Sequence, residues 1–324
     1  MIEIQAKAFR MEQEIWVNTT LGSVRARKIS QKGSLHRIVI FIGLGEFSEK
    51  YADFISFLNE QACEVLIFDW PGLGLSGAFG KPSSTSHSSD FDKLIQAGVD
   101  VIETAGWKNK SFHVIGHSLG GHMAFRLAGL QKFPIAGIIA LSPMMLPKIS
   151  PLFPIYMLAN LISIMGFGQY LIPKTGQNTL LNTRKFSSNN LLSRNQNAIE
   201  NVIDLINKNP SLARAGVSFG WLSSALHSCY KTTLNPVFLK AIKPPVIILA
   251  GSNDKLVSMK AIKKALGFLQ NGQLIFFNES RHELYIELHF HFPALFWDHF
   301  HSNWEALDAI RYLRSQGLPI HSWP

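Results

Sequence analysis

Short apolar runs recur along the chain, and most of their residues are β-branched or aromatic. They lie at residues 38–42, 65–68, 112–115, 135–141, 246–250 and 274–277. Each of the first four is followed directly by Gly, Asp or Ser, which are common in turns. Runs of this length and composition are typical of strands that are buried on both faces. Two shorter runs, at 15–17 and 24–29, surround a turn at 18–22 and predict an opening hairpin.

Between these runs, apolar residues recur with helical spacing at 51–61, 91–104, 123–130 and 259–269. A last helix is expected from about residue 282 to residue 313. Strands that alternate with helices build a mostly parallel central sheet with helices on both faces. The sequence therefore predicts a protein of the α/β class.

Residues 145–237 interrupt this alternation with a segment that begins with prolines and is mostly helical in pattern. The pattern predicts a core of residues 1–144 and 238–324 that carries a helical cap of residues 145–237. The cap follows the strand at 135–141, so it is expected to lie over the edge of the sheet where that strand ends.

The longest uncharged stretch, residues 149–173, lies in this cap. Prolines, glycines and polar residues interrupt it, which favours a short helix at 155–165 over a membrane span. We expect this helix to form an apolar wall for an acyl chain and a face that touches a membrane. The residues expected to bind substrate are Tyr156, Leu158, Leu161, Ile162, Met165 and, outside the helix, Trp221.

Composition limits the class of protein and the partners. The 324 residues are 47% hydrophobic and 16% charged, which excludes a disordered polyelectrolyte. A net charge of +9 favours anionic partners, so peripheral contact with an anionic membrane stays open. The basic residues are scattered and no nucleic-acid-binding module is found, so no nucleic acid is expected. The oligomeric state is left open.

The cysteines and the N-terminal segment bear on location. Two cysteines far apart, Cys63 and Cys229, predict neither a disulfide framework nor a cysteine-rich metal site. The N-terminal segment is acidic and contains no apolar signal core. We expect a cytoplasmic protein, with a peripheral position on the inner membrane surface left open.

Residues 116–121 read Gly-His-Ser-Leu-Gly-Gly, directly after a predicted strand and before a predicted helix. This is the Gly-x-Ser-x-Gly pattern in the strand-turn-helix context that makes a serine a nucleophile. The glycines are expected because a turn this sharp leaves no room for a Cβ beside the strained serine. Ser118 is therefore the candidate nucleophile.

A serine hydroxyl needs a base, and that base needs a partner that fixes its tautomer. The order Ser, acid, His places the acid at Asp254, in the loop after the strand at 246–250. It places the base at His282, in the loop after the strand at 274–277. The alternative for Asp254 is an Asx-turn without a catalytic role.

Three segments resemble bacterial lysophospholipases and the related monoacylglycerol lipases: VLIFDWPGLGLSG at 65–77, GHSLGG at 116–121 and RHELYIE at 281–287. NNL at 189–191 and AGVSFGWL at 215–222 resemble cap segments of the lysophospholipase group. The resemblance implies an α/β-hydrolase fold and an esterase without a cofactor. Its expected reaction is cleavage of a lysophospholipid or monoacylglycerol ester through an acyl-enzyme.

The resemblance also implies an oxyanion hole formed by the backbone N–H groups of Leu44 and Leu119. The family pattern His-Gly-x-Gly-Glu-His stands here as Ile-Gly-Leu-Gly-Glu-Phe at 42–47. A backbone donor does not depend on the side chain, so the implied roles hold.

Two other patterns resemble cofactor or metal sites but lack the context that such sites need. The pattern Gly-x-Gly-x-x-Gly at 72–77 imitates a dinucleotide site, but no helix pattern follows it. The histidines at 289, 291, 299 and 301 would point to different sides of a helix, so no metal is expected. His117, beside the candidate nucleophile, is expected to pack beneath the elbow.

Two rival functions remain. The same triad could serve an acyltransferase or an esterase for soluble substrates, because the residues do not fix the acyl acceptor. A non-catalytic, membrane-associated binding protein is the alternative of another class.

Overall fold

A single sheet organises the computed structural model, which describes residues 10–287 and 320–323. Its strand order is β1-β2-β4-β3-β5-β6-β7-β8-β9. The strands are β1 (Arg10–Thr19), β2 (Gly22–Gln31), β3 (His36–Phe41), β4 (Cys63–Phe68), β5 (Phe112–His117), β6 (Ile135–Leu141), β7 (Val246–Gly251), β8 (Gly272–Phe277) and β9 (Ile320–Trp323).

All neighbours from β4 to β8 are parallel, whereas β1, β2 and β9 pair antiparallel at the two edges of the sheet. The six predicted buried strands and the opening hairpin are confirmed, and the hairpin strands are longer than their apolar centres. From β3 the chain adds β4 on one side, and it then adds β5 and the following strands on the other side, so that β3 and β5 are parallel neighbours. Their carboxyl ends therefore meet at a switch point, where open α/β sheets bind ligands.

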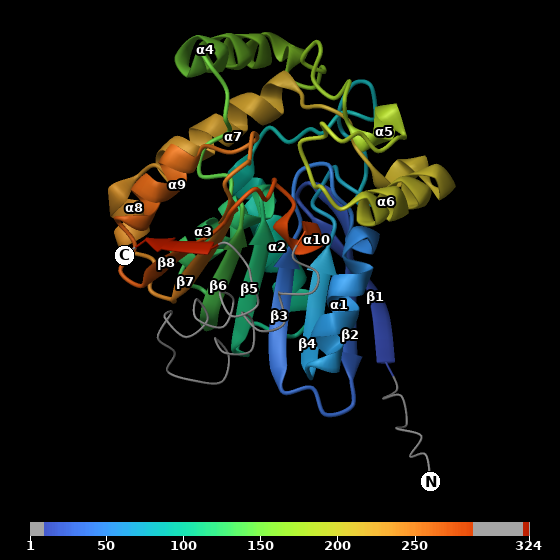
Figure 1. Ribbon diagram of the computed structural model, residues 1–324, viewed down its shortest axis with the longest axis vertical. Helices are drawn as coiled ribbons and strands as arrows, with labels where there is room; N and C mark the ends of the chain where they lie inside the picture. Colours follow the sequence, from blue (N-terminus) through green and yellow to red (C-terminus); the bar gives the residue numbers. More distant parts are fainter. Residues whose placement is uncertain (1–9, 288–319, 324) are drawn as a thin grey trace.

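Helices cover both faces of the sheet, with α1 on one face and α2 and α3 on the other (Figure 1). The helices of the core are α1 (Ala52–Glu60), α2 (Phe91–Thr104), α3 (Leu119–Gly129), α8 (Pro236–Lys240), α9 (Met259–Leu266) and α10 (Leu284–Glu287). The sequence predicted α3 from Met123, which is four residues too late. Of the last predicted helix, α10 is observed, and residues 288–313 lie outside the described part of the chain.

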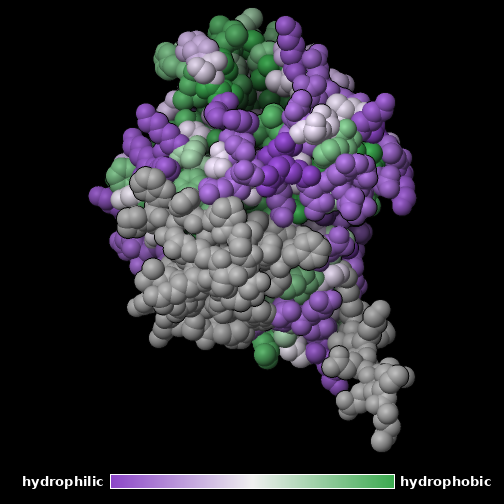
Figure 2. Space-filling model, in the orientation of Figure 1, coloured by the Kyte–Doolittle hydropathy of each residue, from purple (hydrophilic) through white to green (hydrophobic). Residues whose placement is uncertain are grey.

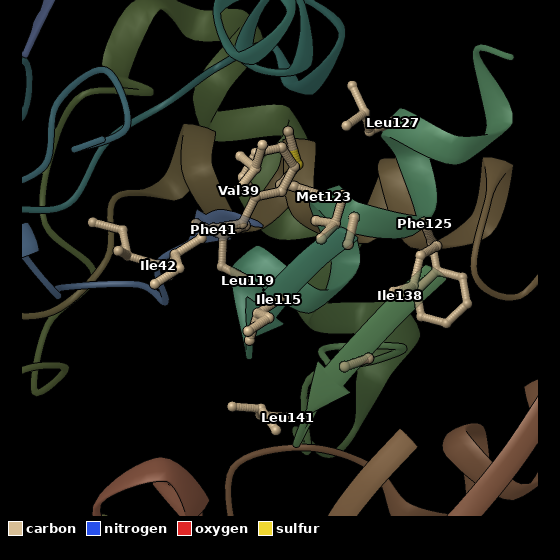
Figure 3. Close-up of a cluster of buried hydrophobic side chains, with 14 of the residues drawn as sticks. Val39, Phe41, Ile42, Ile115, Leu119, Met123, Phe125, Leu127, Ile138 and Leu141 are labelled. Atoms are coloured by element: carbon tan, nitrogen blue, oxygen red, sulfur yellow. The ribbon is translucent and has the colours of Figure 1, made fainter. Parts of the chain in front are cut away.

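The core is packed where α3 crosses the central strands. Leu119 and Met123 of α3 belong to the same buried cluster as Ile115 of β5, Ile138 of β6 and Val39 of β3 (Figure 3). Burial of side chains of this size contributes about 1.5–3 kcal/mol each. The packing therefore fixes the start of α3, and with it the turn that precedes the helix.

The cap lies above the carboxyl ends of the strands (Figure 1). It contains α4 (Leu152–Ile162), a π-helical turn (Ser163–Phe167), α5 (Leu180–Thr183), α6 (Gln196–Lys208) and α7 (Phe219–Lys231). The helix predicted at 155–165 begins three residues earlier, because Pro154 is tolerated in the first turn. Among the described residues, no helix has both the length and the apolarity to cross a membrane.

The cap is also joined to the core by backbone pairing. The loop between β4 and α2 forms isolated bridges with cap residues, from Lys81 to Tyr170 and from Ser86 to Val217. Arg214 of the cap donates to the carbonyls of Gly74 and Gly77 in the same loop. The division into residues 145–237 and a separate core stays a prediction.

Candidate active site

Ser118 lies in the turn between β5 and α3 with φ 52° and ψ −111°, in the left-handed half of backbone space. A side chain at Gly116 would place its Cβ 2.4 Å from the Gly120 carbonyl oxygen, and one at Gly120 would clash with the backbone at Phe41. The glycines are therefore required by close backbone contact. This is the strained elbow that the sequence predicts, and Ser118 is partly exposed at its tip.

Asp254 and His282 lie in the loops that follow β7 and β8, and their side chains are hydrogen-bonded. His282 Nδ1 is 2.7 Å from Asp254 Oδ2. Asp254 Oδ1 accepts from the backbone N–H groups of Leu256 and Val257, so the Asx-turn is also present. The turn orients the carboxylate toward the ring, which means that the two interpretations of Asp254 are compatible.

Both side chains are buried, which affects the acid. Burial alone would raise the pKa of Asp254, but the hydrogen bond and charge of His282 and the two backbone donors outweigh it and lower the pKa. Asp254 is therefore ionised at neutral pH and accepts the proton of Nδ1. The other ring nitrogen, Nε2, is then left as an acceptor, which is the form that a general base requires.

The serine and the histidine come from neighbouring parts of the site. The rings of His117, beside Ser118, and His282 lie 4.8 Å apart between centroids. Within residues 10–287 the Ser118 hydroxyl makes no hydrogen bond, a common arrangement before substrate binds.

Leu44 and Leu119 follow the neighbouring strands β3 and β5. Leu119 is the first residue of α3, where N–H groups are unpaired and the helix dipole favours negative charge. In the described part of the chain, neither the Leu44 N–H nor the Leu119 N–H has an acceptor. Both groups are therefore available to a developing oxyanion, and the role that the family resemblance implies for them stays a prediction.

Beneath the site lies a buried polar cluster that the sequence did not predict. Its centre is the carboxylate of Glu46, which accepts from the N–H of Gly43 and from His117 Nδ1 at 3.1 Å. It also accepts from Lys50 Nζ and from the Tyr285 hydroxyl, each at 3.0 Å. A fifth donor is the hydroxyl of Tyr51, whose ring stacks on Tyr285 with 4.5 Å between centroids.

This cluster connects the loops that carry the three predicted functions. Glu46 belongs to the loop of Leu44, and His117 precedes Ser118. His117 Nε2 lies 3.2 Å from the backbone carbonyl of His282, and Lys50 pairs with Glu283 beside it. The elbow, the oxyanion loop and the histidine loop therefore share one set of hydrogen bonds.

The protonation state of His117 follows from its partners. Nδ1 faces a carboxylate and Nε2 faces a carbonyl, and both partners can only accept. His117 is therefore an imidazolium. Burial alone would lower its pKa, but the charge of Glu46 and the hydrogen bond to it raise the pKa above 6.5.

The charges of the cluster then balance. Lys50 and His117 are positive, Glu46 and Glu283 are negative, and no side chain of the four is more than 5% exposed. Burial alone would raise the pKa of Glu46, but Lys50 and His117 hold it well below its usual value. A neutral cluster of this kind avoids the large cost of an unpaired buried charge.

The six predicted substrate-binding residues lie in different environments. Leu158, Leu161 and Met165 are exposed on the outer surface of the cap. Tyr156 and Ile162 are half-buried, and Tyr156 contacts Tyr230 of α7. Trp221 is buried and packs on Phe91 of the core. Their contact with a substrate stays a prediction.

Neither a dinucleotide site nor a metal site gains support within the described residues. Residues 72–77 form turns and open no helix, so the dinucleotide context is missing. The described residues contain no group of His, Cys, Asp and Glu that could hold a metal. The histidines at 289–301 and the aromatic residues near them lie outside this range.

Comparisons with known proteins identify the family and the relatives of the chain. A family model described as serine aminopeptidase S33 matches residues 34–289. A probable lysophospholipase L2 of Haemophilus influenzae is 21% identical over 264 residues, covering 80% of this chain and 81% of that protein. Human monoglyceride lipase is 22% identical over 258 residues, covering 78% and 77%.

A solved structure provides the comparison of folds. It is a soluble variant of monoglyceride lipase from Saccharomyces cerevisiae in complex with a substrate analogue. Its TM-score is 0.64 at 18% identity, with 86% of this chain and 90% of that chain covered. At this identity the likeness concerns the fold alone.

Proposed function

We propose that this chain, which belongs to the serine aminopeptidase S33 family, cleaves the carboxylic ester of a single-acyl-chain lipid. The chain has the α/β-hydrolase fold and is a hydrolase of the lipase and esterase type. The substrate is a lysophospholipid or a monoacylglycerol. The proposal rests above all on the 2.7 Å bond between Asp254 and His282, at the same sheet edge as the strained Ser118.

The proposed reaction begins with proton transfer. His282 Nε2 takes the hydroxyl proton of Ser118 while Oγ attacks the ester carbonyl carbon. The N–H groups of Leu44 and Leu119 hold the resulting oxyanion, and one such donor contributes about 3–4 kcal/mol in comparable sites. Asp254 stabilises the imidazolium that His282 becomes.

The tetrahedral intermediate then collapses. The bond between carbonyl carbon and alkoxy oxygen breaks, and the leaving alcohol takes the proton from His282. Water attacks the acyl-enzyme in the same way, with His282 first accepting and then returning a proton to Ser118. The products are a fatty acid and the deacylated alcohol.

The apolar outer surface of the cap supports a lipid substrate. α4 buries only Ala159. Figure 2 shows hydrophobic residues gathered at the top of the molecule, over α4. The exposed apolar side chains of α4 and the π-helical turn are Phe153, Met157, Leu158, Leu161, Ile164, Met165 and Phe167.

An exposed patch of this kind is unusual for a surface in contact with water alone. Lys148 and Lys174 are exposed at the two ends of the segment, where they could meet anionic head groups. We propose that the patch rests on a membrane surface from which the substrate is taken.

The test is Ser118→Ala together with a panel of substrates. The variant should fold normally and lose about 10⁶-fold in esterase turnover. A fluorophosphonate probe should label the wild type and not the variant. Activity within tenfold of the wild type would refute the assignment of Ser118.

Product analysis addresses the substrate and the rivals. A long-chain lysophospholipid, a monoacylglycerol, a short soluble ester and a peptide amide are compared. Preference for the short ester would favour a soluble-substrate esterase, and an acylated alcohol as product would favour acyl transfer. No labelling and no turnover would favour the binding protein.

A further inference from the structure

The loop that carries His282 is bonded to a turn of the cap, residues 187–195, which we call the cap turn. This turn precedes α6, and the histidine loop leads into α10. Asn190 folds the turn on itself: Oδ1 accepts from the N–H groups of Leu192 and Ser193, and Nδ2 donates to the carbonyls of Ser187 and Ser193. The cap turn is therefore a defined structure.

Both chain neighbours of His282 are held by this turn. The N–H of Glu283 donates to the carbonyl of Leu192 at 2.8 Å. The N–H of Arg281 donates to one carboxylate oxygen of Glu287, and the N–H of Arg194 donates to the other. Glu287 thus connects the histidine loop to the cap turn through its two oxygens.

The guanidinium of Arg281 adds a second connection. Nη1 donates to the carbonyl of Asn190 at 2.8 Å, and Nη2 donates to the carbonyl of Ser188 at 2.7 Å. A planar guanidinium can reach several carbonyls at once, which an ammonium cannot do. Arg281 therefore depends on the shape that Asn190 gives to the turn.

From the core side, His282 has fewer constraints. Asp254 holds Nδ1 of the ring, and His117 holds the backbone carbonyl. These bonds fix two atoms of the residue, whereas the bonds of Arg281 and Glu283 fix the chain before and after it. The core also holds this loop at Ser280, whose carbonyl accepts from the N–H of Asn253, and at the side chain of Glu283, which pairs with Lys50. Without the cap turn, the N–H of Glu283 and the guanidinium of Arg281 would lose their partners, and the backbone around His282 could shift between these fixed points.

We propose that the cap turn positions the catalytic base, with Arg281 and Asn190 as positioning residues for His282. This inference rests on the proposed function, because it assigns His282 the role of base. A displacement of about 1 Å in a reacting group can cost about 10²-fold in rate. The cap would then contribute to the chemical step with any substrate, including one too short to touch the cap.

The experiment measures the kcat and KM of the Arg281→Ala and Asn190→Ala variants with a short soluble ester. We expect kcat per titrated active site to fall about 10–100-fold, with KM changed less than about threefold. Labelling of Ser118 by a fluorophosphonate should slow by a similar factor, because it needs the same base. Arg281→Lys should be intermediate, because one ammonium can replace only part of the contacts.

The matched control is Arg184→Ala. Like Arg281, Arg184 donates to oxygen atoms of the cap, but it lies within the cap itself, and within the described residues its partners, the Leu181 carbonyl and Asn207 Oδ1, make no bond to the histidine loop. Its kcat should equal that of the wild type. The double variant Arg281→Ala, Asn190→Ala should lose little more than either single variant, because both act through one turn.

The outcomes separate this inference from the proposed function. An active wild type whose variants keep kcat per active site, even at a lower melting temperature, overturns the inference alone. A rise in KM for long-chain substrates with normal turnover of the short ester also overturns it, since the turn would then bind substrate. An inert wild type that no probe labels overturns the proposed function, and the inference with it.

Discussion

Glu46→Gln removes the negative charge at the centre of the buried cluster while preserving the size of the side chain. One oxygen of Glu46 accepts from Lys50 and Tyr285, and the other accepts from Gly43, Tyr51 and His117. In the Glu46→Gln variant an NH₂ group replaces one of these two oxygens, and at either position it faces hydrogen-bond donors instead of acceptors. Even in the better orientation Lys50 Nζ faces an NH₂ group and keeps Glu283 as its remaining charged partner.

The cost can be estimated from the loss of one charge in a balanced set of four. Removal of one partner from a buried ion pair costs about 3–5 kcal/mol. With an m-value of about 3 kcal/mol per M, the urea midpoint should fall by about 1–1.7 M. Turnover should fall about tenfold or more, because the amide oxygen is a weaker acceptor than a carboxylate for the N–H of Gly43, which holds the oxyanion loop. It should fall less than the 10²–10³-fold that accompanies deletion of an oxyanion donor.

Urea unfolding and short-ester turnover measure the two effects. Glu103→Gln is the control, because it makes the same chemical change in a pair with Lys108 whose side chains are 38% and 63% exposed. Exposed pairs contribute about 0–1 kcal/mol. Equal midpoint shifts in the two variants would refute the importance of the buried cluster.

Three further predictions concern the acid, the pH dependence and the cap. Asp254→Asn should slow turnover about 10⁴-fold by stabilising the wrong histidine tautomer. If this variant keeps its activity while substitution of Asp204 abolishes turnover, Asp254 is not the catalytic acid. His117 has a raised pKa in the folded state, so its stabilising contribution is complete below pH 6.5 and is lost as the pH rises through the folded-state value. The stability gap between wild type and His117→Gln, from urea unfolding, should therefore narrow from pH 6 to pH 9, and a constant gap would contradict the imidazolium. Leu158→Asp with Ile162→Asp should reduce turnover of a vesicle-bound long-chain lysophospholipid and spare a short soluble ester, whereas equal losses would indicate packing alone.

The local part of the site was predictable from short windows of sequence. The strained turn at Ser118 requires glycines at fixed positions, so the motif and its strand-turn-helix context identify it. Asp254 and His282 were found from their order and from their places after strands. The motif and the places after strands depend on residues that are neighbours in sequence, and the chain order then distinguishes the acid from the base.

The start of α3 was not predictable in this way. Two glycines after Leu119 lower the local helix propensity and delay the expected start to Met123. The structure needs glycine at Gly120 because a Cβ there would lie 1.9 Å from the Phe41 carbonyl oxygen. Tertiary contact with β3 overrides the propensity.

The buried cluster and the cap turn were missed for a different reason. Lys50 and Glu283 are separated by 233 residues, and nothing near either residue indicates that it is buried. A charged residue in a sequence is more often solvated than buried. The one local signal was Glu46, which follows two glycines at the switch point of the sheet.

The choice of charged rather than apolar residues beneath the site has a physical reason. An apolar cluster of equal volume is often as stable as a buried set of ion pairs or more so. An apolar side chain, however, cannot accept the N–H of Gly43, orient His117 and fix the carbonyl of His282 at the same time. Directional hydrogen bonds hold three separate loops in one arrangement, and such precision matters more to catalysis than the net stability of the cluster. Because the four charges balance, the protein gains this orientation without an unpaired charge in its interior.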